Sequence, residues 1–362
     1  MKREEKISPR QFVFLMLTCI LSTVDVFVPN QAAQYAGRDA WISALAAGLI
    51  GYTIYRVVIM LGLLFPGHSL AGFSRLLLGK YLGGLVTIIY IAGFLTVCVA
   101  VMVQFAVIMP IAFKPESSIY LWDLLILIPA LYIASLGISV PARMNELLLP
   151  VGLLILILVV SLNIPEIDLK KYLPVFENGY LPPAKVTVVI GANLAYSVAI
   201  VSLLPLIENK GRLPGLGLPS FIVVSLALLL GTASIAIFGP DLTAMFLFPA
   251  LQMTRNIDIG FLTRLDAFMM MVWYTGFLIF MTVFSYGAAS LTKDLFGLKD
   301  YRLVLWLYGV VIMVGADFRI TNIPTIMMLL NVPLSILLYA LGLAIPLLLY
   351  MVARIRGYPG RT

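Results

Sequence analysis

Residues 11–37 read QFVFLMLTCILSTVDVFVPNQAAQYAG. This stretch is apolar and long enough to cross a membrane as one helix, which takes about 20 residues. It carries an acid, Asp25, near its middle and a helix breaker, Pro29, four residues later. Hydrocarbon offers no partner for a carboxylate or for freed backbone groups, so such a break is expected only where the segment lines a cavity in the protein. The stretch therefore predicts a broken membrane helix with a ligand or ion site at the break.

The composition of the whole chain is that of a polytopic membrane protein. Of its 362 residues, 62% are hydrophobic and 11% are charged, and the mean hydropathy is +1.05. Soluble globular domains carry about 25% charged residues, so a soluble globule is excluded. The net charge of +7 comes mainly from basic residues in short loops, which is a topological pattern. We therefore expect membrane lipid, and no nucleic acid, around this chain.

Ten segments are apolar and long enough to span a membrane. They cover residues 11–37, 40–64, 84–112, 119–138, 142–163, 184–208, 216–238, 262–290, 301–316 and 324–353. Lys and Arg are more frequent in the loops on the N-terminal side than in the alternate loops, which predicts that both termini are cytoplasmic. We expect an all-α protein with a single transmembrane domain over residues 1–362, in which repeat one covers about 11–163 and repeat two about 184–353.

Three further segments are predicted to lie outside the membrane core. Residues 68–83 alternate apolar and basic side chains as in a short amphipathic helix on the cytoplasmic face. Residues 240–256 contain two prolines and are interpreted as an outer loop helix, and residues 164–183 as a partly ordered outer cap. Partly apolar surfaces of this kind often mark partner sites.

A second interruption stands at the corresponding place in the second half of the chain. Residues 191–197 read GANLAYS and are followed by Pro205. Either break alone is as consistent with a packing kink as with a site, but matching breaks in two halves indicate the binding site of an inverted-repeat transporter fold. The sequence thus predicts a 5+5 inverted repeat with broken first and sixth helices. The expected polar ligand contacts are Ser22, Thr23, Asn193, Tyr196 and Ser197.

Further candidates lie on other predicted helices. Thr282 and Tyr286 are four residues apart and share a helix face, as do Val97 and Val101, which would form an apolar wall. All four also have an ordinary reading as packing or backbone-bonded residues. Asp25 either pairs with a ligand ammonium or a cation, or it is a hydrogen-bonded structural group.

Enzyme chemistry finds no support in the sequence. No serine, cysteine or histidine stands in a base-assisted arrangement, no cluster has metal-ligand spacing, and no glycine-rich phosphate loop follows a strand. We therefore expect no catalytic residues, no metal and no cofactor.

Three motifs resemble a known family, the B subunits of bacterial spore nutrient-germinant receptors, in the amino acid, polyamine and organocation transporter superfamily. They are ISPRQF at residues 7–12, LGKYLG at residues 78–83, and the segment from Phe248 to Trp273, which includes Arg264-Leu265-Asp266. The resemblance implies a leucine-transporter-like fold that senses an amino acid, a sugar or a nucleoside, an amino acid being expected first. It also implies partner A and C subunits and the inner membrane of a dormant endospore. One departure is Leu21-Ser22, where the family commonly has glycine in the first break.

Two functions therefore compete at this stage. In the receptor reading, a nutrient shifts a conformational equilibrium that the partner subunits detect. In the alternative, the chain is an ion-coupled amino-acid transporter, with Thr282 and Ser285 helping to hold sodium beside carbonyl groups. The fifth predicted span has no lysine, so a lysine-based proton relay is absent there.

Overall fold

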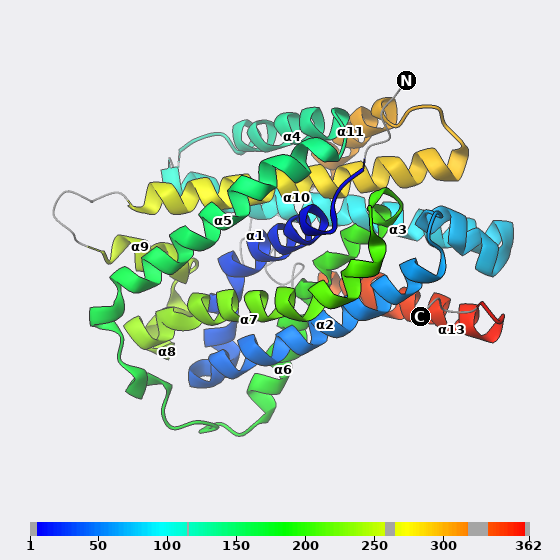
Figure 1. The fold of residues 1–362 in the computed structure, drawn as a ribbon. Helices are drawn as coiled ribbons and strands as arrows, with labels where there is room; N and C mark the ends of the chain where they lie inside the picture. Colours follow the sequence, from blue (N-terminus) through cyan, green and yellow to red (C-terminus); the bar gives the residue numbers. More distant parts are fainter. Residues whose placement is uncertain (1–5, 114–115, 258–264, 318–331, 359–362) are drawn as a thin grey trace.

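A computed structural model describes residues 6–113, 116–257, 265–317 and 332–358, except the side chains of Asp25, Ala199 and Ile200. In these ranges the chain forms long helices that run in one general direction (Figure 1). They are α1 (Pro9–Ala36), α2 (Ala40–Leu64), α3 (Leu70–Phe113), α4 (Ile119–Ser135), α5 (Ser139–Leu162), α6 (Leu181–Leu194), α7 (Leu213–Phe238), α10 (Leu265–Phe296), α11 (Arg302–Asp317) and α13 (Ile345–Ile355). The start of α1 and the end of α13 lie toward the right of Figure 1, which we call the inner end.

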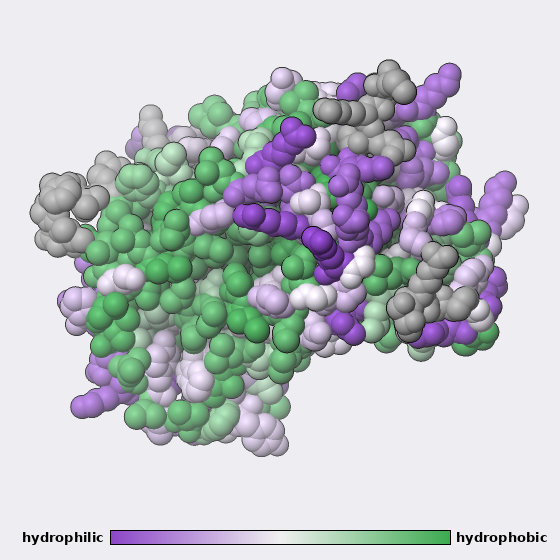
Figure 2. Space-filling view, viewed as in Figure 1, coloured by the Kyte–Doolittle hydropathy of each residue, from purple (hydrophilic) through white to green (hydrophobic). Residues whose placement is uncertain are grey.

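The described helices have the composition of membrane spans. Six described helical stretches are long and apolar enough to cross a bilayer, and they contain α2, α3, α5, α7, α10 and α13. Helices α4 and α11 are shorter, with 17 and 16 residues, and α6 ends after 14. Figure 2 shows apolar residues over most of one face and hydrophilic residues gathered toward the inner end. The chain is an all-α integral membrane protein, while ten spans in a 5+5 repeat remain a prediction.

Helix α10 is the centre of the bundle. Every residue from Gly276 to Ala289 is buried, because α10 packs against α1, α3, α4, α5 and α11. A helix that is apolar on all sides is stable only when other helices surround it. Its middle therefore faces protein on every side, and groups placed there meet no lipid.

The predicted break in the first span is wrong. Helix α1 runs from Pro9 to Ala36 without interruption, and Pro29 is accommodated inside it. The Thr23 hydroxyl donates to the Ile20 carbonyl 3.2 Å away, so it bonds within the helix. No glycine occurs between Gln11 and Ala36, so the run lacks the residue that most readily leaves helical geometry. A proline alone removes one backbone hydrogen bond, which a membrane helix tolerates.

The predicted interruption of the sixth span is present. Helix α6 stops at Leu194, and the chain continues as two 3₁₀ segments, η4 (Ala195–Ser202) and η5 (Leu204–Leu206). A 3₁₀ stretch of eight residues is long for this geometry and is typical of hinges and strained segments. The irregular backbone of η4 packs against α1, α2, α3 and α10, so it lies inside the protein, as membrane depth requires.

The amphipathic helix predicted at residues 68–83 forms the start of α3. Gly79, with φ 82° and ψ 176°, separates this short initial helix from the long apolar helix that follows. Leu70, Phe73 and Leu77 are buried beneath the initial part, whereas Tyr81 is 87% exposed. The boundary falls at Gly79 because few other residues adopt this backbone conformation.

Short helices and an extended segment close the other end of the bundle, which we call the outer end. Helices α8 (Pro240–Met245) and α9 (Pro249–Arg255) replace the single helix predicted at residues 240–256. The segment between α5 and α6 contains the 3₁₀ turns η2 (Ile164–Glu166) and η3 (Leu169–Tyr172). Burial raises the pKa of the Tyr172 hydroxyl to about 12, so it stays protonated and donates to the Thr232 carbonyl at 3.1 Å.

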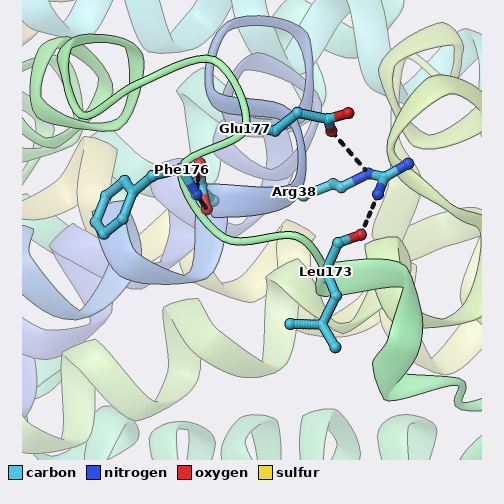
Figure 3. A network of polar contacts seen from close by, with 5 residues as sticks. Arg38, Leu173, Phe176 and Glu177 are labelled. Carbon is cyan, nitrogen blue, oxygen red and sulfur yellow. Dashed lines mark hydrogen bonds and ion pairs between the residues drawn. The ribbon is translucent and has the colours of Figure 1, made fainter.

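Polar contacts fix the segment between α5 and α6, which we call the cap, to the turn between α1 and α2 (Figure 3). The buried Asp39 carboxylate accepts from the Phe176 backbone N–H at 3.0 and 3.1 Å. Arg38 donates to the Leu173 carbonyl and lies 3.6 Å from the Glu177 carboxylate, so two neighbouring residues hold one loop. The buried carboxylate is the stronger anchor, since exposed ion pairs contribute little.

Replacing Asp39 by alanine should loosen the cap. A hydrogen bond to a charged group contributes about 1.5–3 kcal/mol, so we expect a loss of this order and faster hydrogen exchange at the Phe176 amide. Glu177→Gln is the control, because its half-exposed ion pair contributes at most about 1 kcal/mol. Equal exchange rates in the two variants would mean that Asp39 does not anchor the cap.

Candidate functional site

The change from α6 to η4 places two polar side chains in the protein core. Tyr196 and Ser197 are each 1% exposed. The Tyr196 ring makes T-shaped contacts with two α10 rings, with centroid distances of 5.1 Å to Phe280 and 6.3 Å to Phe284. The two phenylalanines stack on each other at 4.4 Å. An aromatic platform on α10 therefore holds the Tyr196 ring in place.

Three polar atoms at this point of the core have no hydrogen-bond partner among the residues that the structure describes. They are Tyr196 Oη, Ser197 Oγ and Gln104 Oε1. Gln104 comes from α3 and lies beside the Tyr196 hydroxyl, so two of the three groups are close together. Buried polar groups are nearly always paired, and an unpaired one costs about 1–3 kcal/mol. The Tyr196 hydroxyl and the oxygen of the neighbouring Gln104 amide can together bind a small polar molecule.

Three further predicted contacts come from α3 and α6, the helices that carry Gln104 and lead into η4. Val97 and Val101 are buried on α3, and with Gln104 they recur at the spacing of one helix face. Asn193 is half-buried in the last turn of α6, where its amide donates to the Val189 carbonyl at 3.2 Å. The apolar wall expected from the valines is consistent with this placement, whereas Asn193 would have to turn to reach a ligand.

Two predicted contacts on α10 lie elsewhere. The Thr282 hydroxyl donates to the Leu278 carbonyl at 2.7 Å and reaches the Ala130 carbonyl of α4 at 3.3 Å. Tyr286 packs edge-on against Tyr301, with ring centroids 5.1 Å apart. Thr282 thus bonds within α10 and toward α4, and Tyr286 faces the inner end.

The predicted residues of the first span also separate. Ser22 lines a crevice between α1, α5 and α10 that does not include Tyr196 or Ser197. Thr23 bonds back to its own helix. The side chain of Asp25 lies outside the described residues, so its role remains a prediction.

A large cavity opens at the inner end of the bundle. It measures about 790 Å³ and is bounded by the start of α3, by η5, by the end of α10 and by the loop before α11. Its charged lining residues are Arg75, Lys293, Asp294, Lys299, Asp300 and Arg302. Ser202 and Tyr286, both buried, form its deeper wall. The cavity therefore leads from the polar surface toward the middle of α10.

Several residues around these sites were not predicted as ligand contacts. Phe280 and Phe284 are four residues apart, a spacing that indicates a shared face, although aromatic pairs in an apolar helix more often signal packing. Asn145 and Trp273 each carry a buried polar atom without a partner. A single polar residue in a span is a signal for such atoms, but it does not show which of them stay unpaired.

Comparison with solved structures identifies the fold. MhsT in complex with L-phenylalanine superimposes with a TM-score of 0.67 over 97% of this chain and 99% of MhsT, at 14% identity. Mhp1, a nucleobase-cation-symport-1 family transporter in a closed conformation with bromovinylhydantoin bound, gives 0.71 over 96% of this chain and 78% of Mhp1, at 13% identity. The chain thus has the fold of these membrane transporters.

Sequence comparison then identifies the family. Residues 6–317 match the profile of the family described as spore germination protein, so the chain belongs to that family. Spore germination protein KB of Bacillus subtilis is 26% identical over 88% of this chain and 86% of its own length. Spore germination protein YndE of the same organism is 22% identical over 97% of both chains. The similarity extends over nearly the whole molecule.

Proposed function

We propose that this chain is the nutrient-sensing subunit of a spore germination receptor, and that it binds a small nutrient, an amino acid in the first place, beside η4. The observation that carries the proposal is the group of buried, unpaired polar atoms on Tyr196, Ser197 and Gln104. A ligand that pairs with these atoms removes a cost of about 1–3 kcal/mol for each of them. Membership of the spore germination family supports a role in sensing.

The geometry of η4 suggests how binding is converted into a signal. This 3₁₀ segment packs against α1, α2, α3 and α10, so a change in its conformation reaches four helices at once. A ligand that binds one backbone arrangement better than another shifts the population toward it by its difference in affinity. An amino-acid carboxylate suits N–H groups and the Tyr196 hydroxyl, and its ammonium suits the Gln104 oxygen or the Asp25 carboxylate.

The subunit would act with the A and C subunits in the spore inner membrane, with both termini on the core side. Exposed apolar residues after Gly79 offer a surface for a partner at the inner end, since Tyr81 is 87% and Leu82 59% exposed. Arg75 is a poor candidate for that surface, because its guanidinium donates to the Leu295 carbonyl at 2.5 Å within the chain. Lys80 is exposed and is the better residue to reverse when the partners are tested.

An ion-coupled amino-acid transporter is the second candidate function. The 790 Å³ cavity favours it, because an open path from one end toward buried Ser202 and Tyr286 is what transport requires. A receptor that evolved on a transporter fold would keep the same opening, so the cavity alone does not decide.

Ligand screening and uptake assays on the purified chain separate the two functions. We expect one amino acid, or another nutrient of small size, to raise the unfolding temperature, because a ligand that binds only the folded state stabilises it. Spores that lack the chain should lose the germination response to that same nutrient, and tagged chain should co-purify with the A and C subunits. Accumulation of the nutrient in proteoliposomes, driven by an ion gradient, would instead establish a transporter.

A further inference from the structure

A second group of unpaired polar atoms lies in the crevice between α1, α5 and α10. The crevice has a volume of about 60 Å³. Ser22, Asn145 and Trp273 all line it, and each has a polar atom without a hydrogen-bond partner: Ser22 Oγ, Asn145 Nδ2 and Trp273 Nε1. The three side chains are 6%, 0% and 2% exposed. Three such atoms around one small cavity indicate a bound group that would pair with them.

The chemistry of these atoms defines the group that would bind. An indole N–H can only donate, and the Asn145 amide nitrogen is also a donor, because the amide oxygen already accepts from the Thr18 hydroxyl at 2.9 Å. The Ser22 hydroxyl can donate or accept. The ligand must therefore offer hydrogen-bond acceptors to these two donors, and a hydroxyl would in addition donate to Ser22. A metal cation is unsuitable, because N–H donors point their hydrogens at it.

The described lining of the crevice favours a neutral ligand over a charged one. Among the described residues that line the crevice there is no Lys, Arg, Asp, Glu or His, and most of this described wall is aliphatic. A carboxylate buried there without a counter-charge would carry a large desolvation cost. The oxygen therefore belongs to a neutral group, a hydroxyl or a carbonyl.

The lipid-facing side of the crevice indicates that the rest of the ligand is apolar and elongated. Leu148, Leu153 and Val272 line the crevice and are only half-buried. Next to them on α5, Leu147 is 70% and Leu154 64% exposed, as expected for side chains in contact with lipid. The lining runs along α5 from Asn145 to Leu156, about 16 Å at the rise of an α-helix, so the crevice is elongated.

We propose that this crevice binds a neutral, elongated amphiphile from the bilayer, such as a long-chain alcohol, with its polar group hydrogen-bonded among Trp273, Asn145 and Ser22 and its chain against the leucines of α5. The site is separate from the nutrient site beside η4 and does not depend on it. Burial of the chain supplies the favourable free energy, and the three hydrogen bonds fix the depth of the head group.

The indole N–H signals of the full-length chain in nanodiscs report on this site directly. The chain has four tryptophans, and Trp273→Phe assigns the signal of interest. We expect 1-decanol to move the Trp273 signal saturably in the direction of hydrogen bonding, and n-decane, which lacks the oxygen, not to do so. Trp122 is the internal reference, because its N–H already donates to Ser117 Oγ at 2.6 Å.

Two variants and a matched control complete the test. Ser22→Ala and Asn145→Leu should each weaken 1-decanol binding about fivefold, the usual effect of one neutral hydrogen bond. Thr275→Val should have no effect, because the Thr275 hydroxyl lines the same crevice but already donates to the Met271 carbonyl at 2.9 Å. The proposal is overturned by equal shifts with decanol and decane, by a Trp273 N–H that is already hydrogen-bonded and unmoved by decanol, or by a shift of this signal with an amino acid.

Discussion

Replacing Tyr196 by phenylalanine should leave the protein at least as stable as the wild type and weaken nutrient binding about tenfold. The ring keeps its contacts with Phe280 and Phe284, and the hydroxyl that is lost has no partner in the core. Removing a buried, unpaired hydroxyl is neutral or stabilising for the fold. If the hydroxyl binds a charged group of the nutrient, its loss costs about 1.5 kcal/mol or more, which is about tenfold in affinity.

Tyr90→Phe is the matched control for this prediction. Tyr90 is also fully buried, but its hydroxyl donates to the Leu341 carbonyl at 2.6 Å. We expect Tyr90→Phe to lower stability by about 1 kcal/mol, because it leaves that carbonyl unpaired, and to leave nutrient affinity unchanged. The measurements are the unfolding temperature of each variant and the ligand concentration that gives half of the thermal shift. Unchanged nutrient affinity in Tyr196→Phe would remove Tyr196 from the site.

The sequence allowed the membrane class and the interruption of α6 to be predicted, but not the continuity of α1. Both runs contain a proline and several hydroxyl residues, so they look alike as patterns. They differ in backbone freedom, since Gly191 precedes the change to 3₁₀ geometry in the second run and α1 contains no glycine. The presence of glycine was therefore a better guide to the break than the presence of an acid and a proline.

Which residues share a site could not be predicted from the sequence. Ser22 and Tyr196 were expected to meet, because both come from the suspected breaks. The direction of a side chain depends on the rotation of its helix against its neighbours, and Ser22 is turned toward Gly276 of α10, where the missing side chain leaves room for its Cβ. Helix rotation follows from three-dimensional packing, which periodicity restricts only to one face.

Two adjacent glycines of α3 should respond to alanine with opposite signs. A Cβ on Gly83 would lie 2.5 Å from backbone atoms of Ser74 and Arg75, and no side-chain rotation can relieve that contact. A Cβ on Gly84 would have its nearest neighbour, the Leu295 side chain, at 3.9 Å, which is ordinary van der Waals contact. We expect Gly83→Ala to destabilise the protein by about 1–3 kcal/mol or more. Gly84→Ala should stabilise it by up to about 1 kcal/mol, since alanine favours the helix.

The close contact at Gly83 also means that Gly83→Ala should disturb the inner end of the bundle. The initial part of α3 folds back at Gly79 and lies against Gly83, and in this position Arg75 caps the end of α10 through the Leu295 carbonyl and lines the inner cavity. Forcing the two parts of α3 apart should release Arg75 and expose it to trypsin. Thermal unfolding and limited proteolysis of the purified variants measure both effects. Similar stability in Gly83→Ala and Gly84→Ala, with Arg75 protected in each, would show that the close approach at Gly83 does not hold the inner end together.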